Sequence, residues 1–171
     1  MEPLLSQLAA LLRREIEQYR ALLAALAEES QRLTANDTDG LLTVTRRKDT
    51  LALQIRSLEE SRYLLTEKIA RALNRKPADL TLRAMCEAAP AGPARDELTA
   101  AREELKTAVE RVSLLNDTNR RLVENSLRLL QGTMEAIQGQ LRRSAAPPKG
   151  YGPPRPRASA PMGGFVVAQR A

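Results

Sequence analysis

The chain has 171 residues, of which 43% are hydrophobic but only 2% aromatic, and its formal net charge is +6. This composition argues against a thick mixed core and favours long helices packed along leucine- and alanine-rich seams. The charge excess arises entirely after Glu135, which leaves 21 basic and 21 acidic residues in the body, so the body is not typical of a nucleic-acid-binding domain. The basic residues responsible are Arg142, Arg143, Lys149, Arg155, Arg157 and Arg170.

The chain contains no histidine and a single cysteine, Cys86, which limits its chemistry. Cys–His and Ser–His catalytic arrangements are therefore excluded, and no cluster of metal ligands or glycine-rich phosphate loop can be identified. We expect no enzyme activity, no cofactor, no metal and no small-molecule substrate. The N-terminal residues do not resemble a secretory signal, and no run of about 18 apolar residues predicts membrane insertion.

A seven-residue apolar repeat predicts the first helix over residues 4–34. A second apolar row widens the stripe, as expected for a helix that contacts two others. The repeat consists of Leu5, Leu12, Tyr19, Leu26 and Leu33, backed by Leu8, Ile16, Leu22 and Leu23.

Turn-forming and helix-capping residues at 34–40 predict a reversal of direction, followed by a second helix over residues 38–74. Its stripe includes two charged residues, Lys48 and Arg62, where the period requires an apolar side chain. One interpretation is that both side chains extend their charges to solvent. The other is a polar layer in which Glu15, Glu28, Glu29 or another carboxylate of a facing helix pairs with them and fixes the register.

A short helix is expected over residues 81–88, with Thr81 as its cap and Leu80, Leu82 and Met85 folded back onto the end of the bundle. Residues 90–93, Pro-Ala-Gly-Pro, must break this helix.

At the C-terminal end of the chain, residues 144–171 are rich in proline and glycine, and we expect a disordered basic tail there. Its single apolar patch, residues 165–167, could be a short binding motif. The remaining residues, 1–143, are predicted to form one helical domain.

The longest predicted helix covers residues 95–142 and contains no proline after its start. At 1.5 Å per residue its core stretch, residues 98–141, would be roughly 65 Å long, more than two helices of about 35 residues can cover. From Asn119 onward the first apolar row turns polar, so the apolar face moves around the helix. The fold class predicted by these elements is all-α, an elongated antiparallel bundle or coiled coil of three long helices and one short helix.

Several of these segments together resemble the FlgN-type flagellar export chaperones over about residues 4–141. The resemblance includes Asp37, Lys48 and the segment Leu58-Glu59-Glu60-Ser61-Arg62 in the second helix. Its most specific part is Leu115-Asn116-Asp117-Thr118-Asn119-Arg120-Arg121-Leu122 in the last helix.

The resemblance implies a cytoplasmic chaperone that binds hook-associated proteins, which join hook to filament, prevents their premature assembly and delivers them to the flagellar export apparatus. It also implies that the substrate-binding region falls on about Leu115 to Leu141. The candidate partner-binding residues are Leu115, Asn116, Asn119, Leu122, Val123, Leu129, Leu130 and Ile137. Of these, Asn116 and Asn119 are expected to be register-setting or polar contacts rather than core residues.

Two other functions are compatible with the pattern. One is a structural coiled-coil homo-oligomer or adaptor in which the last helix pairs with itself. The other is a nucleic-acid binder that acts through the basic tail. The second alternative is the weaker, because the body is charge-neutral and offers almost no aromatic surface for bases.

Overall fold

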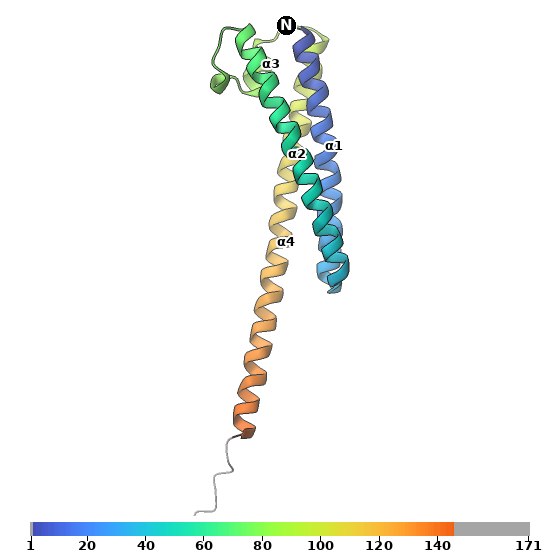
Figure 1. Cartoon of the computed structure of the whole chain (residues 1–171), viewed down its shortest axis with the longest axis vertical. Helices are drawn as coiled ribbons and strands as arrows, with labels where there is room; N and C mark the ends of the chain where they lie inside the picture. The colour runs from blue at the N-terminus through green and yellow to red at the C-terminus, as the bar shows by residue number, and fades with distance from the viewer. Residues whose placement is uncertain (1, 146–171) are drawn as a thin grey trace, which may run out of the picture. The chain divides into compact units, whose positions relative to one another are not determined.

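The computed structural model describes residues 2–145, all of whose regular elements are helical. Three long helices are α1 (Glu2–Ala35), α2 (Thr38–Ala72) and α4 (Pro93–Ala145), and α3 (Leu82–Ala88) is short (Figure 1). A 3-10 turn, η1 (Pro77–Asp79), was not expected. The predicted all-α fold is confirmed, with helix ends within three residues of the expected ones. Of the expected tail, residues 144 and 145 belong to α4, and residues 146–171 lie outside the described part.

The reversal between α1 and α2 is built by a small set of local contacts. Asn36 adopts a left-handed backbone conformation with φ 53°, and the Asp37 carboxylate accepts a hydrogen bond from the Gly40 N–H at 3.0 Å. Arg32 also donates to this carboxylate at 2.6 Å. A Cβ at position 40 would lie 2.4 Å from Asp37 Oδ2, so glycine is required there by close approach.

Ion pairs define the directions of the long helices. Arg13 pairs with Glu97 at 3.3 Å, and Arg20 pairs with Glu104 one heptad further along both helices. Because the residue numbers of the paired side chains increase together in both helices, α4 runs parallel to α1. In the pairs between α1 and α2, Glu15 with Arg62 and Glu29 with Lys48, one number rises as the other falls, so α2 runs antiparallel to α1. Each long helix is therefore antiparallel to the long helix before it in the chain, as expected for an antiparallel bundle, whereas α1 and α4 are parallel to each other.

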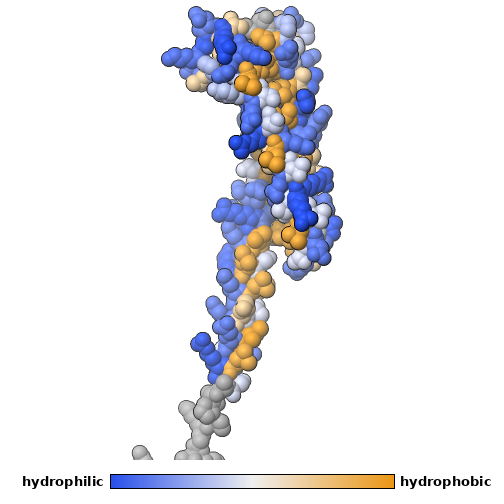
Figure 2. All heavy atoms as spheres, viewed as in Figure 1, coloured by the Kyte–Doolittle hydropathy of each residue, from blue (hydrophilic) through white to orange (hydrophobic). Residues whose placement is uncertain are grey.

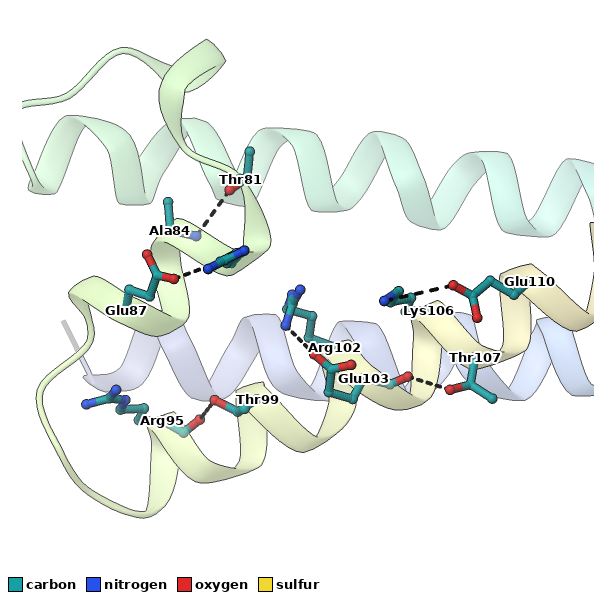
Figure 3. A network of polar contacts seen from close by, with 11 residues as sticks. Thr81, Ala84, Glu87, Arg95, Thr99, Arg102, Glu103, Lys106, Thr107 and Glu110 are labelled. Atoms are coloured by element: carbon teal, nitrogen blue, oxygen red, sulfur yellow. Dashed lines mark hydrogen bonds and ion pairs between the residues drawn. The ribbon is translucent and has the colours of Figure 1, made fainter.

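The main core lies where α3 packs against the three long helices. It includes Leu8 and Leu12 of α1, Ile69 of α2, Met85 of α3 and Leu98 of α4, all at most 2% exposed. Thr81 caps α3, because its side chain accepts the Ala84 N–H at 3.1 Å (Figure 3). Leu80 and Met85 are buried and Leu82 is half-buried, so this segment folds back as expected.

A smaller core cluster lies nearer the turn between α1 and α2, where Ala25 packs with Val44 and Leu51. By its internal contacts the chain divides after Leu129. All contacts above belong to the first unit, and the described part of the second unit is the last section of α4, residues 130–145.

Candidate partner-binding surface

The first half of α4 is a core helix. Leu98, Ala101, Leu105 and Ala108 are buried at alternating spacings of three and four residues. Asn119 is the last buried residue of α4 in the described part of the chain. The spacing keeps these side chains on one face of the helix, which packs against the core.

The second half of α4 carries apolar residues that are exposed. They follow one another at spacings of four, three, four, three and four residues, which places them on one helix face. Figure 2 shows hydrophobic side chains gathered along one side of this part of α4 and hydrophilic ones along the other. We call this set the exposed stripe; its members, with exposed fractions, are Val123 (39%), Leu127 (53%), Leu130 (61%), Met134 (61%), Ile137 (52%) and Leu141 (64%).

Three of the eight sequence-predicted partner-binding residues, Val123, Leu130 and Ile137, belong to the exposed stripe. Leu129 is 73% exposed, but it lies about 100° around the helix from Leu130. Leu115 and Leu122 are half-buried. These last three form a separate row at seven-residue spacing.

The two predicted asparagines differ from each other. Asn116 is exposed, as expected. The expectation that Asn119 lies outside the core was wrong, because it is 3% exposed and hydrogen-bonded to α1.

The prediction missed Leu127, Met134 and Leu141 of the exposed stripe. The heptad that starts at Leu98 leads to Ser126 and Thr133, whereas the apolar residues after Asn119 follow spacings of four, four and then three. The alternation from Val123 to Leu141 is visible in the sequence once the register is shifted by one residue at Asn119.

Asn119 belongs to a polar layer that joins all three long helices. Lys48 Nζ lies 2.8 Å from both carboxylate oxygens of Glu29. The Asn119 side-chain amide donates to Glu29 Oε2 at 2.9 Å and to the Leu26 carbonyl at 2.8 Å. Asn119 Oδ1 is buried and has no partner among the described residues. The layer therefore holds α4 to α1 at the last buried position of α4.

A second polar contact joins α1 and α2. Arg62 Nε lies 3.1 Å from Glu15 Oε1, and the Glu15 side chain is 1% exposed. Burial raises the pKa of Glu15 above its ordinary value of 4.5, and the neighbouring Arg62 acts in the opposite direction. Both charged residues of the α2 stripe thus contact a carboxylate of α1. That these contacts fix the register remains a prediction.

Two other kinds of site would need clustered metal ligands or a long apolar helix. Within residues 2–145 there is no group of three or more His, Cys, Asp or Glu side chains that could hold a metal ion. No described helix is long and apolar enough to cross a membrane. The exposed stripe is the candidate site, and an apolar helix face of this kind is typical of proteins that bind another polypeptide.

Comparison with known protein families identifies the family of this chain. The model of the FlgN protein family matches residues 1–155. The chain belongs to the FlgN family, which is the flagellar export chaperone family. No curated protein and no solved structure matches the chain. The predicted family is confirmed, and the chain is a flagellar export chaperone that binds flagellar proteins.

Proposed function

We propose that the chain binds hook-associated proteins in the cytoplasm, prevents their premature assembly and delivers them to the flagellar export apparatus. The observation that carries this proposal is the exposed stripe of α4. Contiguous apolar surface on an isolated soluble domain is an aggregation hazard, and it usually marks a site that a partner covers. In an export chaperone the partner expected at such a site is the cargo.

The stripe has the geometry for binding an amphipathic helix. Its six side chains span about five turns of the helix, the arrangement used when a helix recognises another helix. Each side chain is roughly half exposed, so its burial contributes on the order of 1 kcal/mol. The sum, about 6 kcal/mol before the entropic cost of association, is sufficient for a reversible complex.

Reversibility suits a chaperone that must release its cargo at the export apparatus. Amphipathic terminal helices of a hook-associated protein would be masked while they lie on the stripe, so they could not polymerise. The half-buried Leu115 and Leu122, with the exposed Asn116, would border this contact.

The proposal is tested by titrating the full chain with purified hook-associated proteins, using calorimetry and light scattering. We expect a stoichiometric complex and delayed polymerisation of the hook-associated protein. Binding to no hook-associated protein, while another flagellar export substrate binds tightly, would overturn the assignment of the cargo. Self-association of the chain through α4 would favour the homo-oligomer instead.

A further inference from the structure

Apart from the exposed stripe, the chain has a hollow between α2 and the segment that contains η1 and α3. Its volume is about 440 Å³, which is within the usual range of ligand sites. We call it the α2–α3 hollow, and all the residues that line it belong to the first unit of the chain. Its lining includes the buried Leu80 and Met85 and the half-buried Leu82 from one side, and Glu59, Arg62 and Tyr63 of α2 from the other.

The two charged residues that line the hollow differ in whether a neighbour neutralises them. Arg62 Nε lies 3.1 Å from Glu15 Oε1, and the Glu15 side chain is 1% exposed, so this pair carries no net charge. Glu59 accepts a hydrogen bond from the Tyr19 hydroxyl at 3.4 Å and makes no ion pair with a described residue. The α2–α3 hollow therefore carries one uncompensated negative charge.

The ionisation of Tyr19 reflects the same negative charge. The pKa of Tyr19 is raised above its ordinary value of 10.0, first by burial and then by the charges of Glu59 and Glu15, whereas Arg62 acts in the opposite direction. The carboxylates thus outweigh the guanidinium at this place, and the local potential favours a cation.

The lining also offers surfaces that a long cationic side chain can use. Tyr63 is 60% exposed, so much of its ring is accessible, and a guanidinium can stack on an aromatic ring. Leu82 and Met85 provide apolar contacts for the methylene groups of the same side chain. A guanidinium has five donors in one plane, and it can direct two of them to a carboxylate such as that of Glu59.

Other side chains match the α2–α3 hollow less well. A purely apolar group would cover Glu59 without pairing its charge, which costs desolvation free energy. A carboxylate would meet Glu59 as a like charge, and the guanidinium of Arg62 is already paired with Glu15. A lysine ammonium matches the charge, but it is more strongly hydrated and has no planar group for stacking or bidentate bonding.

We propose that the α2–α3 hollow binds an arginine side chain of a partner polypeptide, with Glu59 as the carboxylate that pairs with it and Tyr63 as the stacking surface. This inference goes beyond the proposed function, because none of the lining residues belongs to the exposed stripe. The chain then has a second contact that depends on charge and weakens as salt is added.

The test uses the full chain, isotope-labelled at its methionine methyl groups, and nuclear magnetic resonance. Met85 lines the hollow, and Met134, a member of the exposed stripe, is the internal control. The probe is N-acetyl-arginine amide, which presents the side chain without the terminal charges of a free amino acid. We expect the Met85 signal to shift and to saturate with a Kd on the order of 1 mM, and the Met134 signal to stay unchanged. The uncharged N-acetyl-citrulline amide, similar in shape, should bind at least about threefold more weakly.

Two variants and a matched control identify the groups involved. Glu59→Gln removes the charge and Tyr63→Leu removes the ring, and circular dichroism checks that both exposed positions tolerate the change. Each variant should weaken binding of the arginine probe by about threefold. Glu60→Gln alters the adjacent carboxylate, which is paired with Arg56 at 3.4 Å, and should leave the affinity unchanged.

Equal affinity for the arginine and citrulline probes, an unchanged affinity of Glu59→Gln, or no shift of Met85 would each overturn the inference. Tighter binding of free arginine than of the blocked probe would also overturn it, because the ligand would then be the amino acid itself. So would stronger binding after truncation at Arg143, because an arginine of the chain's own C-terminal residues would then be the occupant. None of these results bears on the cargo proposal, which depends on the exposed stripe.

Discussion

Glu15 of α1 and Arg62 of α2 meet at 3.1 Å across the interface between these helices, with the Glu15 side chain 1% exposed. Glu29 and Lys48 meet in the same antiparallel register two heptads away. We predict that these two charged pairs, at equivalent heptad positions, select one alignment of α1 against α2, because a slip of one turn would leave the carboxylates without partners.

Arg62→Met tests the energetic role of the first pair. Without Arg62 the Glu15 carboxylate is buried and unpaired, so we expect the free energy of unfolding to fall by about 3 kcal/mol. Adding Glu15→Met should restore most of the loss, because two apolar side chains then face each other. Urea denaturation of the single and double variants measures both effects. An unchanged midpoint for Arg62→Met would contradict a stabilising ionic contact.

The raised pKa of Glu15 predicts a particular pH dependence. Because burial raises this pKa above 4.5 in the folded chain, the folded state binds the proton more tightly than the unfolded state. The contribution of Glu15 to stability is therefore complete below about pH 4.5 and is lost as pH rises through the folded pKa. Compared with Glu15→Gln, the unaltered chain should become relatively less stable over this window. A difference that grows in the opposite direction would mean that Arg62 dominates and lowers the pKa.

Asn119→Asp and Asn119→Leu separate the polar and apolar roles of position 119. The aspartate would place a second carboxylate beside Glu29, whose Oε2 lies 2.9 Å from the present amide, and we expect a loss of about 3 kcal/mol. Leucine removes the unpaired oxygen but also the two hydrogen bonds that the amide donates to Glu29 and to the Leu26 carbonyl, so we expect a smaller loss of about 1 kcal/mol. Equal loss in both variants would show that shape alone matters at this position.

Much of this architecture could be predicted from periodicity. The heptad of α1 and the charged Lys48 and Arg62 in an otherwise apolar stripe are visible in the sequence, and they predicted both the helices and the possible polar layer. The choice of Glu15 and Glu29 as partners could not be made, because it depends on the alignment of α1 with α2.

The burial of Asn119 was missed for a related reason. Its partners, the Leu26 carbonyl and Glu29, are brought to it only when α4 packs on α1. A strict heptad also drifts by about 20° per repeat on a straight helix, so extending the Leu98 repeat led away from Leu127 and Met134.

Gly132 and Gly139 are expected to weaken α4 locally, because glycine favours the helix less than alanine does. A Cβ at position 132 would meet nothing within 4 Å, and at position 139 only the Arg143 side chain at 3.9 Å. Alanine at each position should therefore stabilise the helix by about 1 kcal/mol. Hydrogen exchange of amides 130–143 should slow in the double variant, and Ala136→Gly should accelerate it. Unchanged exchange in both would show that neither position limits local opening.

A binding titration with matched aspartate variants tests most directly whether the exposed stripe binds the cargo. Leu130→Asp and Ile137→Asp alter the stripe, whereas Leu114→Asp alters a residue that is 71% exposed on the opposite face of α4, about 180° from Val123. Circular dichroism checks that each variant keeps its helix content, and a truncation after Arg143 removes the basic tail. We expect the two stripe variants to weaken binding of the hook-associated protein by about 100-fold or more, and Leu114→Asp and the truncation to change it little. Loss of binding in Leu114→Asp or in the truncated chain, with the stripe variants unaffected, would contradict the account.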